Sequence, residues 1–189
     1  MDDLLTVVIS FVLLNFTATF AVIGFAVAGV VIAVHRRRGH ELWQTLLDWF
    51  LFFGIGLTYI YNGVMHTVFG DFSAALIGWE NNGFQAEVGF ASIGMGIVAL
   101  MAFPRRAPVS LKLAALVGPA CFLWGAAGAH IADIIARGNF SSHNAGVVLY
   151  TDIVIPIIGF ALWGAMVRSR PRTRRRALPT EEAPVLIDA

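Results

Sequence analysis

The stretch LLTVVISFVLLNFTATFAVIGFAVAGVVIAV (residues 4–34) contains no charged residue, and three arginines follow it at residues 36–38. A transmembrane helix needs about 20 apolar residues, so this stretch can cross a bilayer with residues to spare. Its acidic start, Asp2 and Asp3, differs from the basic start of a secretory signal peptide, whose apolar core has about 7–15 residues. The stretch therefore predicts a retained membrane-spanning helix.

The composition of the whole chain is also that of a membrane protein. Of its 189 residues, 58% are hydrophobic and 13% are charged, and the mean hydropathy is +0.75. A soluble domain carries about 25% charged residues, and the charges here are separated by long uncharged stretches. These features exclude a soluble globule and a disordered chain, and they predict an all-α, polytopic membrane helix bundle.

Five apolar stretches have the length that a membrane span requires. They predict transmembrane helices at residues 4–34, 42–68, 85–103, 111–136 and 147–167. The helix bundle then comprises residues 1–168. The tail, residues 169–189, is rich in Arg and Pro and then acidic, and it has no apolar period that could be buried, so we expect it to be disordered.

The basic residues predict how the bundle is oriented. Of the 13 Lys and Arg residues, three follow the first span, three lie between the third and fourth spans, and six follow the fifth. Five crossings place these segments on one side, which the positive-inside rule makes cytoplasmic. The N-terminus is then outside and the C-terminus cytoplasmic. The arginine-rich tail is typical of a lipid-headgroup anchor, so we expect no nucleic-acid partner.

Small residues in two spans predict close contacts between helices, because small side chains let backbones approach in lipid. The first span carries Thr17, Ala21, Gly24 and Ala28, and the fourth carries Gly125, Gly128, Ala129 and Ala132.

Polar side chains gather in the half of the bundle that this topology places outside. Asn62 and His66 share one face of the second span, and His130 and Asp133 share one face of the fourth. Ionisable groups in a span are costly and usually face the bundle interior or a watery cavity. We therefore predict one acidic, histidine-containing pocket that opens outward. Its candidate residues are Asn62, His66, Glu80, Asn81, Gln85, Glu87, His130, Asp133 and Asp152.

The outer loops contain the most distinctive strings of the chain. The first reads WENNGFQAE (residues 79–87), and the second, residues 138–146, could lie against it. With GAH at residues 128–130, GNF at 138–140, NAG at 144–146, and YTDI at 150–153 followed by Pro156, the chain resembles DUF6790, an uncharacterised family of small bacterial multi-pass membrane proteins. The resemblance covers about residues 42–165. It implies a location in the bacterial inner (plasma) membrane, and it assigns no activity, cofactor or catalytic residue.

Two hypotheses place a metal in the pocket. His66, His130, Glu80, Glu87 and Asp133 offer the imidazole and carboxylate ligands that zinc, iron or manganese can take. Alternatively, His66 and His130 are axial ligands of a haem, for which the small residues around His130 leave room. Either centre would make the protein a membrane-embedded redox or hydrolytic enzyme, although the chain contains no metal-binding or haem-binding motif.

Two further hypotheses need no metal. Buried His, Asp and Glu residues mark ion and proton pathways, so transport of a small solute or ion is the leading interpretation. A five-helix chain without an inverted repeat would then act as an oligomer. Alternatively, the same residues hydrogen-bond between helices, and the protein is a structural or assembly subunit of a membrane complex. The partners are then the lipid bilayer and either a second copy or another membrane protein.

Overall fold

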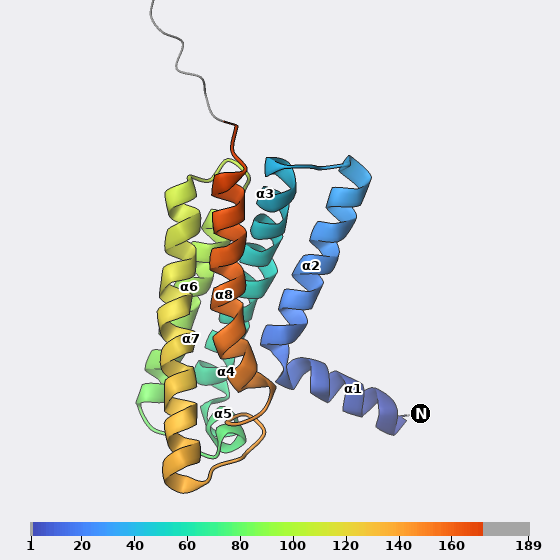
Figure 1. The fold of residues 1–189 in the computed structure, drawn as a ribbon. Coiled ribbons are helices and arrows are strands. Elements are labelled where there is room, and N and C mark those ends of the chain that lie inside the picture. Colours follow the sequence, from blue (N-terminus) through green and yellow to red (C-terminus); the bar gives the residue numbers. More distant parts are fainter. Residues whose placement is uncertain (1, 172–189) are drawn as a thin grey trace, which may run out of the picture.

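The computed structural model describes residues 2–171, and every regular element in this range is a helix (Figure 1). The elements are α1 (Asp2–Leu14), α2 (Phe16–His35), α3 (His40–Trp49), η1 (Phe50–Leu57), α4 (Thr58–Val68), α5 (Gly70–Ile77), α6 (Phe84–Ala102), α7 (Val109–Arg137) and α8 (Val147–Arg168). The prediction of an all-α fold is confirmed. The expected disordered tail falls almost entirely on residues 172–189, which lie outside the described residues.

Four helices of the described range, α2, α6, α7 and α8, are long and apolar enough to cross a membrane. The predicted span at residues 42–68 is instead divided into α3, the π-helix η1 and α4. The hydroxyl of Thr58, the first residue of α4, donates to the backbone oxygen of Phe53 in η1, five residues earlier, at 3.0 Å. Gly54 and Gly56 lie in this segment, and glycine weakens a regular α-helix by about 1 kcal/mol relative to alanine. The π-helix therefore forms where the α-helix is intrinsically weakest.

The stretch predicted as one helix over residues 4–34 is divided at Asn15, where α1 turns away from the bundle (Figure 1). Asn15 has φ −108° and ψ 38°, outside the helical region. Its side-chain Nδ2 donates to the backbone oxygen of Phe11 at 2.9 Å. A short amide side chain that bonds its own backbone competes with continuation of the helix, and this explains the break.

Small residues bring α2 against α3 and η1. The buried residues of α2 are Thr17, Ala21, Gly24 and Ala28, so the predicted contact face of this helix is confirmed. A Cβ at Gly24 would lie 2.9 Å from the backbone oxygen of Trp49, which leaves no room for a larger residue. On α7, by contrast, a Cβ at Gly125 or Gly128 would meet no atom within 4 Å. The second predicted stripe is therefore not a helix contact.

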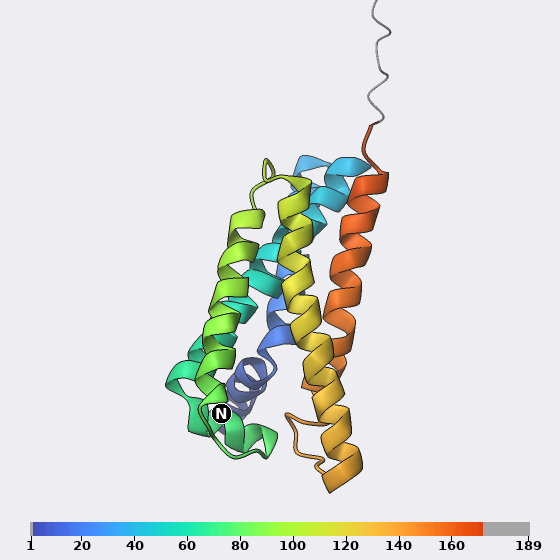
Figure 2. The same cartoon turned by 90° about the vertical axis from the view of Figure 1, so that its left-hand side faces the viewer.

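The two ends of the bundle differ. The end that carries α5 also holds the loops of residues 78–83 and 138–146; we call it the α5 end (Figure 1). The opposite end, which we call the tail end, holds residues 36–39, residues 103–108 and the end of α8. Figure 2 shows α7 between α6 and α8 along the length of the bundle. Apolar side chains fill the half next to the tail end, including Leu47, Phe50, Leu51, Leu116, Leu162 and Met166.

Candidate functional site

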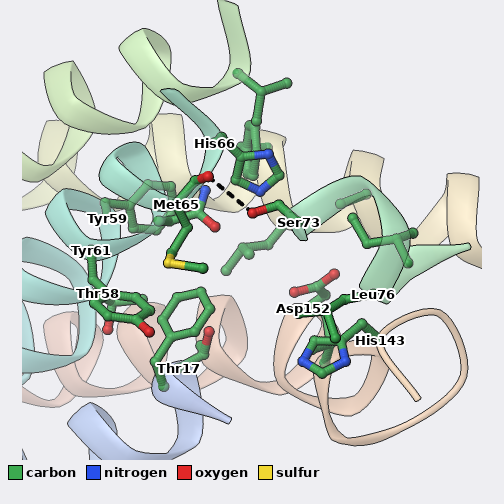
Figure 3. Close-up of a pocket in the computed structure, with 18 of the residues that line it drawn as sticks. Thr17, Thr58, Tyr59, Tyr61, Met65, His66, Ser73, Leu76, His143 and Asp152 are labelled. Carbon is green, nitrogen blue, oxygen red and sulfur yellow. Dashed lines mark hydrogen bonds between the residues drawn. The ribbon is translucent and has the colours of Figure 1, made fainter. Parts of the chain in front are cut away.

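A half-open cavity of about 360 Å³ lies in the half of the bundle next to the α5 end. Its walls come from α4, α5, α6, α7 and α8, and the junction between α1 and α2 closes one side (Figure 3). Aliphatic and aromatic side chains form most of the surface, with a few polar groups among them. This combination is typical of sites that bind small molecules.

Five of the nine candidate residues line this cavity. They are Asn62, His66, Gln85, His130 and Asp152. They come from α4, α6, α7 and α8, so the fold brings together residues that are far apart in the sequence. The lining also includes polar or aromatic residues that were not among the candidates: Thr17, Thr58, Tyr59, Tyr61, Ser73, Trp79 and His143. On α4 the helical spacing of Thr58, Asn62 and His66 already indicated this face.

His130 lies on the α7 wall, and Asn144 fixes its tautomer. The Nδ2 group of Asn144 donates to the backbone oxygens of Asn139, at 2.7 Å, and of His130, at 3.4 Å. The amide oxygen of Asn144 is therefore the atom that faces His130 Nδ1, 2.7 Å away. An amide oxygen only accepts hydrogen bonds, so Nδ1 carries a hydrogen. The other ring nitrogen, Nε2, lies 3.8 Å from Asp152 Oδ2.

Asp152 is a buried carboxylate in the second turn of α8, and only 6% of its side chain is exposed. Within residues 2–171 its only ion-pair partner is His130, and its carboxylate accepts no hydrogen bond. A separation of 3.8 Å is longer than a hydrogen bond, which spans about 2.7–3.2 Å between nitrogen and oxygen. The carboxylate is thus held near an imidazole at the cavity wall, and it can still accept a hydrogen bond from a molecule in the cavity.

Two hydrogen bonds join α4 to α6 at the opposite wall. The side-chain amide of Gln85 donates to the backbone oxygen of Gly70 at 3.4 Å, so its oxygen accepts from His66 Nδ1 at 3.2 Å. Asn62 Nδ2 donates to Ser92 Oγ at 2.9 Å. His66, like His130, therefore has Nδ1 held by an amide oxygen. His66 and His130, the two axial ligands of the haem hypothesis, therefore both line the cavity with Nδ1 engaged by an amide.

Asp133 does not line the cavity but joins three groups behind it. Its Oδ2 accepts hydrogen bonds from Trp79 Nε1, at 2.9 Å, and from Asn139 Nδ2, at 2.7 Å. Its Oδ1 accepts from Arg137 Nε and forms an ion pair with this side chain. The indole of Trp79 in turn stacks on the imidazole of His130, with 5.6 Å between the ring centroids. Asp133 is therefore a structural group that positions one wall of the cavity.

The loop of residues 138–146 is bonded to the end of α5, and this places it beside the loop of residues 78–83. Asn139 Nδ2 and Ser141 Oγ both donate to the backbone oxygen of Ile77, at 3.0 Å and 2.6 Å. The next residue, Gly78, has φ +81°, a left-handed conformation that L side chains rarely adopt. This glycine ends α5 and leads the chain into residues 79–83.

The remaining candidates are not in the cavity, which corrects the expectation of one acidic pocket. Glu80, Asn81 and Glu87 are exposed, and Asn81 Nδ2 donates to Asp71 at 2.6 Å. Glu80 and Asn81 lie in the loop that follows Gly78, and Glu87 lies on an exposed face of α6. Within residues 2–171 no three His, Cys, Asp or Glu side chains are close enough to hold a metal ion. The five proposed metal ligands are therefore not brought together.

A second polar cluster, near the tail end, was missed by the sequence reasoning. Lys112 Nζ donates to Asp48 Oδ1 at 2.6 Å and to the backbone oxygens of Ala102, at 2.7 Å, and Pro104, at 3.1 Å. The two side chains are 1% and 4% exposed. Lys112 was expected to belong to a basic loop. The available signal was Asp48, a carboxylate within an apolar span, because such a group needs a buried partner.

A comparison with family models matches residues 14–172 to the family of unknown function DUF6790. The match covers most of the chain, including every cavity residue from α2 to α8. Neither the curated proteins nor the solved structures contain a significant match. The chain therefore belongs to DUF6790, a family of unknown function.

Proposed function

We propose that this protein crosses the membrane five times and transports a small, largely apolar solute that binds in the cavity next to the α5 end. The single observation that carries this proposal is the cavity itself. It has about 360 Å³ of space, mainly apolar walls and one buried carboxylate–imidazole pair. A helix bundle that only needed to pack would fill this volume with side chains, because protein interiors are normally close-packed.

The fifth crossing would be the continuous helical segment α3–η1–α4, from residue 40 to residue 68. At about 1.5 Å per residue its length exceeds the roughly 30 Å of a bilayer core. It lies alongside α2 and α6 through most of the bundle (Figure 1). A polar residue inside it, Asp48, is neutralised by Lys112, which lowers the cost of placing it in lipid.

The proposed orientation puts the tail end in the cytoplasm. Arginines occur there after α2, between α6 and α7, and at or after the end of α8: Arg36, Arg37, Arg38, Arg105, Arg106, Arg168 and Arg170. The positive-inside rule favours this side as cytoplasmic. The cavity would then face the outside of a bacterial plasma membrane, and the packed half of the bundle would close it toward the cytoplasm.

Movement of a solute past this packed half requires helices that can bend. Proline interrupts α7 at Pro119 and α8 at Pro156, and each proline removes one backbone hydrogen bond. Isolated π-helical segments such as η1 are often found at functional sites. Two of these irregular points, η1 and Pro119, lie within the packed half, and Pro156 follows the core residue Ile155. They support transport over a purely structural role.

Ligand protection against thermal unfolding tests whether the cavity binds a solute. The purified protein is heated with benzyltrimethylammonium (a cation), neopentylbenzene (its neutral isostere) or 3-phenylpropionate (an anion). We expect at least one of them to raise the Tm of the wild type and of Ala132→Phe, a variant on an exposed position outside the cavity. Ala126→Phe, which fills the cavity, should remove the rise. Equal shifts in all three proteins, or none, would contradict the proposal.

A further inference from the structure

Building on the proposed function, we propose that the solute is a monovalent organic cation, and that it exchanges with a proton on the His130–Asp152 pair. The structure brings a buried carboxylate, an imidazole of fixed tautomer and an apolar, aromatic cavity to one place. Each of these three features restricts the charge or the chemical class of the solute that can bind.

The charge of the cavity favours a cation. No Lys or Arg is among the described residues that line it, and Asp152 is the only carboxylate there. An ionised carboxylate at this depth needs a positive partner. Only two partners can reach it: a protonated His130, 3.8 Å away, or a cation bound in the cavity.

The hydrogen bond to Asn144 limits the pair to one exchangeable proton. It already places a hydrogen on His130 Nδ1, so the second proton is the one that His130 carries on Nε2, the nitrogen next to the carboxylate of Asp152. With this proton the pair has no net charge, and without it the pair has a charge of −1. When a cation binds at Asp152, the N–H bond at Nε2 breaks, its electron pair stays on nitrogen, and the proton goes to water. One cation enters for one proton that leaves, and the charge of the site is conserved.

The walls of the cavity favour an organic cation over a metal ion. A metal ion needs several oxygen, nitrogen or sulfur ligands, and the described residues hold no group of three His, Cys, Asp or Glu side chains that could supply them. Instead, Phe16, Tyr59, Tyr61, Trp79 and Phe122 line the cavity. Aromatic faces attract alkylammonium groups, and desolvation increases this attraction. A small ammonium compound with an apolar substituent satisfies both the aromatic wall and the carboxylate.

The other titratable groups around the pair have hydrogen-bond partners within residues 2–171, apart from Nε2 of His66. On α4, the hydroxyls of Tyr59 and Tyr61 donate to the backbone oxygens of Pro119, at 3.2 Å, and of Leu13, at 3.4 Å, and Nδ1 of His66 is held by an amide. In the loop before α8, His143 Nε2 donates to the backbone oxygen of Leu14 at 3.0 Å, and its Nδ1 accepts from a serine hydroxyl. On α7, Asp133 is paired with an arginine. The lining residues of α1, α2, α5 and α6 carry no charge.

Proton release on binding tests the exchange directly. Benzyltrimethylammonium has a fixed charge, so any proton released near neutral pH comes from the protein. We expect about one proton per bound cation, measured with a pH indicator in weakly buffered detergent solution. Asp152→Asn should lose the release and weaken binding of the cation at least tenfold. Glu87→Gln, an exposed carboxylate outside the cavity, is the matched control and should behave as the wild type.

The wild type alone provides a second test that does not depend on whether a variant folds. If one proton leaves for each cation, the Kd for benzyltrimethylammonium must rise as the pH falls, by up to about tenfold per pH unit. The Kd for neopentylbenzene must stay constant. A pH-independent Kd for the cation, or cation binding without proton release, would overturn the exchange.

The neutral isostere separates this inference from the proposed function. If neopentylbenzene protects the wild type as well as the cation does, and Ala126→Phe abolishes both effects, the cavity binds solutes but does not select cations. The inference then fails and the proposed function survives. If neither compound protects the wild type, and 3-phenylpropionate does not protect it either, both fail.

Discussion

Asp48 and Asp152 are both buried carboxylates of the helix bundle, but their surroundings give them different roles. Asp48 is bonded to the ammonium group of Lys112 at 2.6 Å, and together the two side chains close the bundle near its tail end. Asp152 faces a cavity and lies 3.8 Å from an imidazole. Asp48, which is bonded directly to a lysine, therefore stabilises the fold. Asp152, which is not bonded directly to a cation, can bind a proton or a ligand.

At this scale we predict that Lys112→Met destabilises the protein by about 3–5 kcal/mol, because it leaves the buried carboxylate of Asp48 without a positive partner. The double variant Lys112→Met/Asp48→Leu should recover most of this loss. Arg105→Met, which breaks an exposed pair with Glu41, should cost less than about 1 kcal/mol. Chemical unfolding in detergent measures all three. If Lys112→Met is as stable as the wild type, the Lys112–Asp48 pair does not stabilise the bundle.

The sequence predicted residues of the candidate site where helical periodicity applied. Asn62 and His66 share one face of α4, and both line the cavity. Glu80 and Glu87 were placed there because they are acidic and close to the outer side, but loop direction and helix rotation cannot be read from charge. Asn144 was missed because its role depends on a contact between a loop and α7.

At the scale of elements, glycines determine how closely α4 and α6 approach. A Cβ at Gly63 would clash with Ile93 Cγ1 and would lie 2.9 Å from the backbone oxygen of Gly89. We therefore predict that Gly63→Ala separates the two helices and costs about 1–3 kcal/mol, the usual effect of overpacking. The control is Gly94→Ala on α6, where a Cβ would have no atom within 4 Å. This substitution should leave the stability unchanged or raise it slightly. Thermal unfolding compares the two variants, and equal Tm values would contradict the close approach.

The positions of the helices were largely predictable, and their interruptions were not. The spans at residues 85–103 and 147–167 agree closely with α6 and α8, because continuous apolar stretches of this length favour helices. The breaks at Asn15 and at η1 depend on individual side-chain hydrogen bonds and on backbone geometry. Hydropathy averages over such details, so it predicted one helix where the structure has two or three.

At the scale of the whole molecule, the proposed topology predicts which loops face outside. In a background without the exposed native Cys121, a cysteine at Asn82 or Ser142 should react with an impermeant thiol reagent in intact cells. A cysteine at Arg106, in the exposed loop at the tail end, should react only after the cells are opened. Labelling of Arg106→Cys but not of the other two positions in intact cells would show the opposite orientation. Equal labelling of all three positions would show that α6 and α7 do not cross the membrane.

The same topology gives α1 a location. This 13-residue helix is too short to cross a bilayer, and it projects sideways from the bundle near the α5 end (Figure 1). An apolar helix of that length is more typical of the membrane interface than of a span. Because Leu13 and Leu14 line the cavity, α1 would lie beside the entrance that a solute uses.

Uptake of radiolabelled benzyltrimethylammonium into proteoliposomes tests the central claim, transport through the cavity, most directly. With an acidic lumen, the proposed exchange predicts accumulation above that in protein-free liposomes by the wild type and by Ala132→Phe. Ala126→Phe, which fills the cavity, and Asp152→Asn, which removes its charge, should show none. Uptake that is the same in all four proteins and in protein-free liposomes would contradict the account.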